Sequence, residues 1–348
     1  MSRWMPSMRG LLAGLLLAAA VAPLQAAAPA ASASSTAELE SRAQALARAS
    51  AAVVGVHAVA VEDARSAETL GRERRGSGVV IGPDGLVVTI GYLIMEADHV
   101  DLVLERDRVV PARVVAYDIA SGFGLLQPLT PVRVAPASLG NPASLGPDEP
   151  LVIASGGEAG DLSIARIVSR RPFSGYWEYH IDGALFTTPP RTDHSGAALF
   201  NAKGELLGIG SLVVLDAAGS GHAGVPGNMF VPVDLLKTIL PELRLRGATP
   251  ASTRAWLGLN CAEADREVRV MRITRDSPAE AAGLRPGDRI VRIDGAPVKN
   301  LEGFYKSLWH GAPPEREVTL TVARADGEQT VKVQARDRMK TLRKARGI

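Results

Sequence analysis

The feature that most constrains the fold is a succession of short β-branched segments separated by turn sequences. Residues 79–81 (VVI), 86–88 (LVV) and 206–214 (LLGIGSLVV) are examples of such segments. The connections at residues 82–85 (GPDG) and 201–204 (NAKG) have hairpin composition. The 35 glycines and 23 prolines of the chain predict many more turns. Short strands at this spacing predict a mainly β fold, either a sandwich or a barrel.

The first residues have the pattern of a secretory signal peptide. Arg3 and Arg9 precede an uncharged apolar run over residues 11–21, and the small residues 26–28 (AAA) follow. The run is shorter than the roughly 20 residues that a membrane-spanning helix needs, so we expect cleavage rather than an anchor. We therefore expect an exported mature protein and, in a bacterium, a periplasmic one.

The charge and cysteine content argues against nucleic acid binding, an intrachain disulfide and a metal site built from several cysteines. Lys and Arg number 39 and Asp and Glu 37, a formal net charge of +2, so the chain lacks the basic surface that nucleic acid binding needs. The single Cys261 excludes an intrachain disulfide and a site of several cysteines around a metal. We expect no metal and no cofactor, because no group of His, Asp and Glu has ligand spacing.

A second folding unit is indicated towards the C-terminus. Residues 276–284 (DSPAEAAGL) carry the start and stop signals of a short helix, and a Pro-Gly turn and a strand ending in Asp-Gly follow. This string resembles the core of a PDZ domain of the bacterial, circularly permuted type. Residues 256–259 (WLGL) are similar to the carboxylate-binding loop of that family. The resemblance implies that Leu257, Gly258 and Leu259 direct backbone N–H groups at a peptide C-terminus.

The same resemblance implies how a peptide binds. The peptide would add a strand beside residues 259–261, with main-chain hydrogen bonds supplying affinity and a pocket supplying selectivity. The spacing of four apolar residues fits the helix that walls such a groove, and core packing is the alternative for some of them. They are Leu301, Phe304, Tyr305 and Leu308.

The first folding unit resembles the trypsin-like serine proteases of the HtrA/Deg type. Residues 76–81 (GSGVVI), the GPDG turn and residues 86–89 (LVVT) match the opening hairpin of that family, which also carries a C-terminal PDZ domain. The resemblance implies two six-stranded β-barrels of the trypsin-like fold followed by an α/β PDZ domain. We expect a signal peptide over 1–28 and a leader over 29–50, which is flexible up to a short helix over residues 38–50. The trypsin-like domain is expected over 51–245, with a closing helix over residues 233–243, and a linker over 246–253 and the PDZ domain over 254–335 follow. For the basic residues 336–348 we expect a solvated tail, for which a membrane contact is the alternative.

The resemblance also allows the catalytic positions to be compared one by one. Hydrolysis by this route needs a serine nucleophile, a histidine base and a carboxylate that orients the base. Ser195 occupies the nucleophile position, but Tyr92 stands in the histidine position and Gly122 in the aspartate position. A phenol with an ordinary pKa of about 10 is a poor base at neutral pH. Asp118 survives, but it matches the outer aspartate of the motif rather than the orienting one.

The oxyanion hole is altered as well. Its donors would be the backbone N–H groups of Asp193 and Ser195, and Asp193 replaces a glycine of the family. A side chain at that position disfavours the backbone conformation that glycine permits, and a carboxylate would repel a developing oxyanion.

The remaining histidines are the candidates for a replacement base. They are His57, His99, His180, His194, His222 and His310. We expect His57 and His99 in strands, His180 and His222 in loops, and His310 in the PDZ unit. His194 is adjacent to Ser195, and neighbouring residues in such a turn rarely align for proton transfer. We therefore expect no substitute base.

Three functions fit these observations. The first is an exported pseudoprotease that binds unfolded polypeptides or C-terminal peptides of envelope proteins, in a scaffold or regulatory role. The second is an active periplasmic serine endopeptidase that uses Ser195 with a non-standard base. The third is a chaperone-like holdase, which would elaborate the first. We favour the first, and leave the oligomeric state open between monomer and trimer, because residues 29–91 lack the aromatic side chains that hold family trimers together.

Overall fold

The computed structural model describes residues 30–105, 108–146, 149–158, 160–219 and 224–344. The predicted signal peptide and His222 lie outside the described residues. The chain divides between Ser41 and Arg42 into two units, and the second unit contains all the sheets described below. In the described part of the chain, no helix combines the length and apolar character needed to cross a membrane.

The N-terminal helix is longer than the sequence pattern predicted. Helix α1 runs over Ala30–Ser50, whereas the expected helix began at residue 38. The additional residues are alanines, serines and one threonine, and alanine has the highest intrinsic helix propensity of all residues. The leader that we expected to be flexible is therefore helical from Ala30 onwards.

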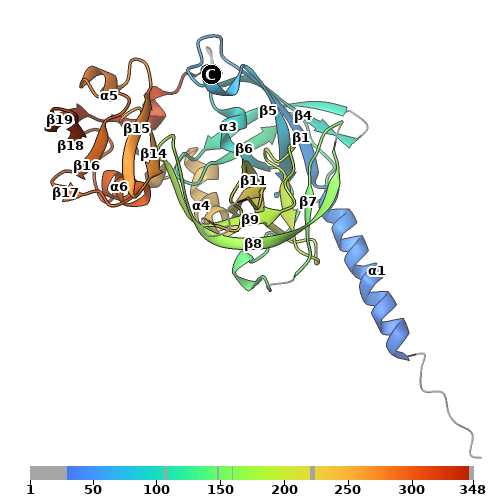
Figure 1. Cartoon of the computed structure of the whole chain (residues 1–348). Coiled ribbons are helices and arrows are strands. Elements are labelled where there is room, and N and C mark those ends of the chain that lie inside the picture. The colour runs from blue at the N-terminus through green and yellow to red at the C-terminus, as the bar shows by residue number, and fades with distance from the viewer. Residues whose placement is uncertain (1–29, 106–107, 147–148, 159, 220–223, 345–348) are drawn as a thin grey trace, which may run out of the picture. The chain divides into compact units, whose positions relative to one another are not determined.

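Two closed six-stranded barrels form the first part of the second unit, as predicted (Figure 1). The first barrel consists of β1 (Val53–Ala60), β2 (Glu73–Val80), β3 (Val87–Ile90), β4 (Ala97–Leu104), β5 (Arg108–Tyr117) and β6 (Phe123–Pro128), in the order β1-β2-β3-β6-β5-β4. The second consists of β7 (Leu151–Ala154), β8 (Leu162–Gly175), β9 (Tyr179–Thr188), β10 (Ala198–Phe200), β11 (Leu206–Val214) and β12 (Gly227–Pro232), in the order β10-β11-β12-β9-β8-β7. The β-branched segments seen in the sequence supply buried side chains such as Val79 and Val87.

The PDZ unit has a five-stranded path with one short strand attached. Its strands are β14 (Leu259–Ala264), β15 (Glu267–Ile273), β16 (Arg289–Ile293), β18 (Glu317–Arg324) and β19 (Gly327–Gln334), and β17 (Ala296–Pro297) pairs with β16. Helices α5 (Pro278–Ala281) and α6 (Leu301–Trp309) complete it. All four apolar residues that we placed on the groove helix are buried on α6. They form one core with the sheet, so core packing applies to each of them.

Three helices accompany the two barrels: two lie between strands of the first barrel, and one follows the last strand of the second. They are α2 (Ala67–Leu70), α3 (Gly91–Ile94) and α4 (Val233–Arg246), with 3-10 turns at Pro142–Ser144 and Pro250–Ser252. The predicted closing helix after the second barrel is α4, and it ends at Gly247, which has a positive φ of 74°. Gly247 thus supplies the left-handed conformation that commonly ends a helix.

The described part of the basic C-terminal segment, residues 336–344, is folded rather than a solvated tail. Strand β20 (Arg336–Asp337) pairs with β13 (Ala255–Trp256), and a 3-10 turn over Arg338–Thr341 follows it. The backbone N–H of Arg343 donates to the Glu96 carboxylate at 2.8 Å. Our expectation missed these contacts because backbone pairing to a distant strand leaves no signal in local charge composition.

One hairpin extends beyond the second barrel. Strand β9 pairs with β12 only over residues 185–187, whereas it pairs with β8 back to Tyr179. Residues 171–184 therefore form a two-stranded arm, whose tip is residues 176–178. Figure 1 shows the long β8 and β9 running together.

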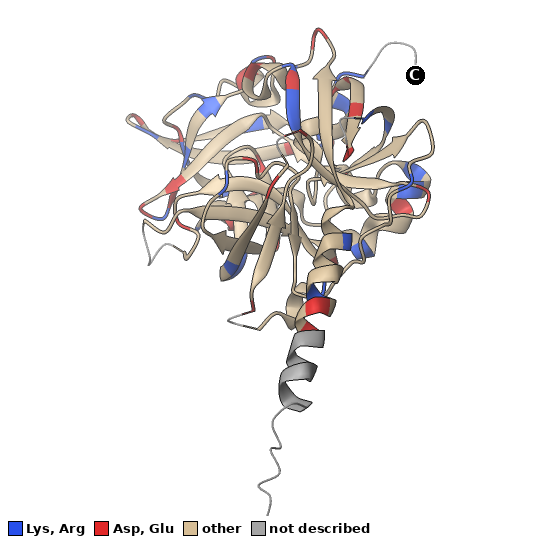
Figure 2. Cartoon of the chain, turned by 90° about the vertical axis from the view of Figure 1, so that its right-hand side faces the viewer, with Lys and Arg blue, Asp and Glu red and all other residues tan. Residues whose placement is uncertain are grey.

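Charged side chains of both signs are interspersed over the face drawn in Figure 2. This distribution agrees with the near balance of Lys and Arg against Asp and Glu. It gives no sign on this face of the one-sided positive field that favours nucleic acid binding.

Candidate functional site

The candidate nucleophile lies in a turn that is fixed against the first barrel. Ser195 is positioned between β9 and β10, and its carbonyl accepts a hydrogen bond from the Ser77 N–H on β2 at 2.8 Å. The next residue, Gly196, has a φ of 74°, and a Cβ there would overlap the Ser77 carbonyl oxygen. The turn therefore needs glycine at position 196, and it holds Ser195 at the junction of the two barrels.

Tyr92 occupies the place beside Ser195 that a base would need. It lies on α3, directly after β3, and its hydroxyl is 2.8 Å from the Ser195 hydroxyl and 2.9 Å from the Ser211 carbonyl. A carbonyl can only accept, so when the single phenol proton goes to Ser211 the Ser195 hydroxyl donates to the phenol oxygen. Burial raises the pKa of Tyr92 to about 12, against the hydrogen bond with Ser195, which lowers it.

The chemical consequence is that Ser195 is hydrogen-bonded to a neutral partner. A phenolate is absent at neutral pH when the pKa is about 12, and a neutral phenol oxygen does not take up a proton to form a stable cation. The contact satisfies the serine hydroxyl without activating it.

The space beside Gly122, where the sequence predicted the position of an orienting carboxylate, is filled by another tyrosine. Gly122 has a φ of 85°, and a Cβ on it would lie 2.9 Å from the Tyr179 hydroxyl oxygen. Tyr179 is buried at the start of β9, and its hydroxyl donates to the Ser121 carbonyl at 2.7 Å. Sequence reasoning missed Tyr179, because nothing local to residue 179 indicates that it reaches a loop of the other barrel.

Asp118, the surviving aspartate of the motif, has a structural role. One carboxylate oxygen accepts from the backbone N–H and the hydroxyl of Ser121, at 2.9 and 2.5 Å. The other oxygen accepts from the Ser252 hydroxyl at 2.5 Å. Asp118 thus ties its loop to the segment that leads into the PDZ unit.

Asp193 is held by neighbouring groups of the second barrel. Its carboxylate accepts from Arg191, with Nε at 2.8 Å, and from the Ser155 hydroxyl at 2.5 Å. The hydrogen bond from Arg191 is the main reason that the pKa of Asp193 is lowered. The non-glycine residues with positive φ do not include Asp193, so it lacks the conformation that a glycine could adopt there.

The histidines do not supply a base in the described part of the chain. None of their nitrogens hydrogen-bonds the Ser195 hydroxyl, and His194 Nδ1 lies instead 3.2 Å from the Arg191 carbonyl. His57 and His99 are in strands β1 and β4, as predicted, and His310 ends α6. The prediction for His180 was wrong, because it lies in β9, where the arm continues the strand past the barrel.

His180, Asp182 and Glu302 gather closely enough to be considered as metal ligands. Lys306 lies between the carboxylates, with its ammonium 3.2 Å from Asp182 and 2.6 Å from Glu302. The lysine thus already supplies the positive charge that a cation would bring.

The predicted peptide-binding loop carries the clearest ligand-like contacts. Gly258 has a φ of 84°, and the N–H groups on either side of it, from Leu257 and Leu259, point at one carboxylate. That carboxylate belongs to Glu178, at the tip of the β8–β9 arm, at 3.2 and 2.8 Å. Sequence reasoning found the loop but missed Glu178, which is 79 residues from Leu257.

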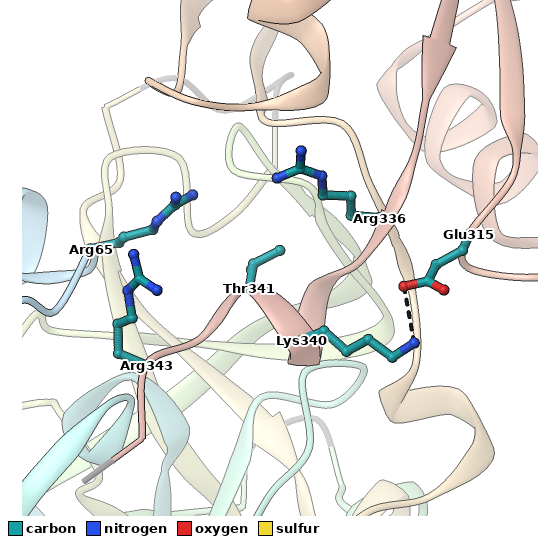
Figure 3. Close-up of a pocket in the computed structure, with 6 residues that line it drawn as sticks. All are labelled: Arg65, Glu315, Arg336, Lys340, Thr341 and Arg343. Atoms are coloured by element: carbon teal, nitrogen blue, oxygen red, sulfur yellow. Dashed lines mark hydrogen bonds and ion pairs between the residues drawn. The ribbon is translucent and has the colours of Figure 1, made fainter. Parts of the chain in front are cut away.

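A separate pocket of about 190 Å³ is lined by basic side chains and one carboxylate. Its residues are Arg65, Glu315, Arg336, Lys340, Thr341 and Arg343. Figure 3 shows that Lys340 pairs with Glu315, at 3.0 Å. None of these side chains takes part in the Ser195 site or in the Leu257–Leu259 loop, so the pocket belongs to neither.

Two family models match this chain and together span both parts of it. A trypsin-like peptidase domain matches residues 76–209, and a PDZ domain matches residues 255–335. The class of protein is therefore a trypsin-like double barrel followed by a PDZ domain.

Curated proteins are similar in sequence to about three quarters of this chain. Proteins named "Probable periplasmic serine endoprotease DegP-like" from Hahella chejuensis and Pseudomonas fulva are each 26% identical, over 74% and 76% of this chain and 56% and 57% of their own length. The chain thus spans just over half the length of these curated relatives.

Solved structures share the fold. The HtrA-type protease AlgW with a decapeptide matches with a TM-score of 0.53 at 18% identity, covering 85% of this chain and 98% of AlgW. The serine endoprotease from Yersinia pestis matches with a TM-score of 0.51 at 19% identity, covering 85% and 97%. In domain order and fold, this chain is similar to the HtrA type of trypsin-like, PDZ-containing proteins.

Proposed function

We propose that this chain is an exported HtrA-type pseudoprotease that binds polypeptide through its PDZ unit and does not hydrolyse it. The observation that carries the proposal is the 2.8 Å contact between the Ser195 and Tyr92 hydroxyls, in the place where a base would stand. It gives the serine a neutral partner, and Tyr179 takes the space of an orienting carboxylate.

Several parts of the catalytic machinery are replaced at once: the base, the orienting carboxylate and the oxyanion-hole glycine. Removing a member of a working triad costs on the order of 10⁴ to 10⁶ in rate, and the losses do not add because the residues act as a unit. What would survive is at most the weak acceleration that binding and an oxyanion hole give on their own. Even that is reduced, because Asp193 stands where the family has glycine.

Peptide binding is supported by the Leu257–Leu259 loop. Its N–H groups already hold a carboxylate, which is the chemistry that recognises a peptide C-terminus. Free C-termini of unfolded or envelope proteins are the ligands that we propose, in a scaffold, regulatory or chaperone-like role. The N-terminal pattern of Arg3, Arg9 and an apolar run, together with the periplasmic names of the relatives, supports a periplasmic location.

Hydrolysis of casein by the mature chain, beside its Ser195→Ala variant, tests the proposal. We expect equal, background rates for the two proteins, and no labelling of Ser195 by a fluorophosphonate. Turnover and labelling that disappear only in Ser195→Ala would overturn the proposal and establish an active serine endopeptidase with a non-standard base. Suppression of client aggregation without cleavage products would add the chaperone-like role.

A further inference from the structure

The tip of the β8–β9 arm, residues 176–178, lies in the groove where the PDZ unit would hold a peptide. The Glu178 carboxylate takes hydrogen bonds from the N–H groups of Leu257 and Leu259, with the Leu259 bond at 2.8 Å. Its two oxygens lie at 3.3 and 3.2 Å from the Leu257 nitrogen. A C-terminal carboxylate of a peptide would need these same two donors.

The backbone of the tip also behaves as an added strand. The N–H of Cys261, on β14, donates to the Tyr176 carbonyl at 2.9 Å. Main-chain bonding of this kind to an exposed sheet edge is how an extended peptide is bound. Tyr176 precedes Glu178 by two residues, and Cys261 follows Leu259 by two. The two bonded pairs, Glu178 with Leu259 and Tyr176 with Cys261, therefore share one antiparallel register between the tip and β14.

The opposite wall of the groove holds the tip as well. The Tyr305 hydroxyl, from α6, donates to the Gly175 carbonyl at 2.8 Å and accepts from the Glu178 N–H at 3.2 Å. Tyr305 is completely buried. The loop, the edge strand and the helix of the groove therefore each contact the arm, and the contacts are those that a peptide ligand would make.

Two features of Glu178 make this arrangement costly. Its φ is 57°, a left-handed conformation that non-glycine residues seldom adopt. The residue is only 7% exposed, and burying an ionisable group disfavours its charged form. Residues that accept such costs are commonly held in place by function rather than by local preference.

We propose that residues 176–178 are an internal ligand of the PDZ groove, which a free C-terminal carboxylate must displace to bind. We call this segment the latch. The proposal rests on the peptide binding put forward under Proposed function, and it adds the regulation of that site. Because only the open form can bind, the apparent affinity for a peptide falls by the fraction of molecules that are open. Removing the latch should restore the intrinsic affinity.

The latch can be tested in the full mature chain with three variants. Glu178→Ala removes the carboxylate, and Glu178→Gln keeps the size of the side chain in case alanine destabilises the fold. Asp182→Asn is the matched control, because Asp182 lies on the same arm and pairs with Lys306 of α6, yet it does not contact the Leu257–Leu259 loop. Its side chain is 70% exposed, so its loss should matter little.

The first measurement is hydrogen exchange at the backbone N–H groups of Leu257, Leu259 and Cys261. We expect exchange at least tenfold faster in Glu178→Ala than in the wild type, an intermediate rate in Glu178→Gln and no change in Asp182→Asn. Unchanged exchange in Glu178→Ala would overturn the latch, whatever the peptide measurements give.

The second measurement is fluorescence anisotropy with a fluorescein-labelled pentapeptide pool. The pool has the sequence Ser-Gly-Tyr-Trp-X, in which X is Ala, Val, Leu or Phe with a free carboxylate, and the carboxamide pool is the control. We expect the free-acid pool to bind Glu178→Ala at least tenfold more tightly than the wild type or Asp182→Asn, and the carboxamide pool to bind none of them. Equal binding of the free-acid pool by all variants would overturn the latch and leave the proposed function standing. Faster exchange with no binding by any variant would overturn the proposed function instead.

Discussion

Glu178 and Tyr179 are consecutive residues that enter two different sites. The Glu178 carboxylate accepts from the Leu257 and Leu259 N–H groups of the PDZ unit, whereas the Tyr179 hydroxyl donates to the Ser121 carbonyl beside Gly122 in the first barrel. The start of β9 therefore connects the candidate peptide groove to Gly122, the predicted position of an orienting carboxylate. A substitution at Glu178 or at Tyr179 should therefore affect both the candidate peptide groove and the loop at Gly122.

Restoring a histidine at position 92 should not by itself restore hydrolysis. Tyr92→His would place an imidazole near Ser195, but the space for an orienting carboxylate holds Tyr179. Without an orienting group a triad loses about 10⁴ in rate. We expect Tyr92→His to cleave casein no faster than Ser195→Ala, measured by release of labelled fragments. Serine-dependent turnover in Tyr92→His would contradict the role that we assign to Tyr179.

Introducing the missing carboxylate should destabilise the protein. In Gly122→Asp, the new Cβ would lie 2.9 Å from the Tyr179 hydroxyl oxygen, and the backbone would keep a φ of 85°. Left-handed strain and overpacking each cost on the order of 1–3 kcal/mol. We therefore expect the free energy of unfolding to fall by about 2 kcal/mol or more, as measured by urea denaturation.

A matched control for this substitution is available in the same domain. Gly146 has open space around its Cβ direction and no positive φ, so Gly146→Asp should change the free energy of unfolding by less than about 0.5 kcal/mol. If Gly122→Asp proved as stable as Gly146→Asp, the packing of Tyr179 against residue 122 would not be a constraint.

The pH dependence of peptide binding should follow Glu178. Burial raises the pKa of Glu178 to about 7, against the opposing effects of Arg338 and of the loop N–H groups. A pKa that is raised in the latched form means that this form binds protons more tightly than the open form. Glu178 therefore stabilises the latched form fully at pH values below its ordinary pKa. This stabilisation of the latched form is lost as the pH rises through about 7.

We accordingly expect the affinity of the wild type for the free-acid pool to rise by about tenfold or more between pH 5 and pH 8, and that of Glu178→Ala to stay flat. Besides Arg338, the titratable groups that face Glu178 are Cys261 and Tyr305, whose pKa values burial raises, so both stay protonated over this range. His180, two residues away, has a pKa lowered by burial. An equal pH dependence in Glu178→Ala would assign the effect to His180 or to another group.

The hydroxyl of Tyr305 should contribute both to the latch and to the stability of the fold. Tyr305→Phe keeps the buried ring in the PDZ core but removes the hydrogen bonds with Gly175 and Glu178. We expect a loss of about 1–3 kcal/mol in the free energy of unfolding and tighter binding of the free-acid pool, by anisotropy. Tyr176→Phe is the control, because that ring is exposed and Tyr176 meets Cys261 through its carbonyl. Unchanged peptide affinity in Tyr305→Phe would show that Tyr305 on α6 does not hold the latch in the groove.

The sequence alone determined the fold class and the order of the domains. Short β-branched segments and hairpin turns such as residues 82–85 are local signals, because a strand and its turn are specified by neighbouring residues. The same holds for the short helix and turn over residues 276–287, whereas the assignment of Ser195, Tyr92 and Gly122 to catalytic positions stays a prediction. The helix start at Ala30 and the strand at His180 were missed, because composition alone does not mark where such elements begin and end.

Only the tertiary structure decided what those residues do. Tyr179 meets Ser121 across 58 residues of sequence, Tyr92 meets Ser195 across 103, and Glu178 meets Leu259 across 81. Contacts of this kind depend on how two barrels and a PDZ sheet pack, and an isolated Trp-Glu-Tyr segment contains no sign of its partners. The reason is physical: a buried carboxylate or phenol is stabilised by donors and acceptors that folding brings to it, and the sequence near residue 178 names none of them.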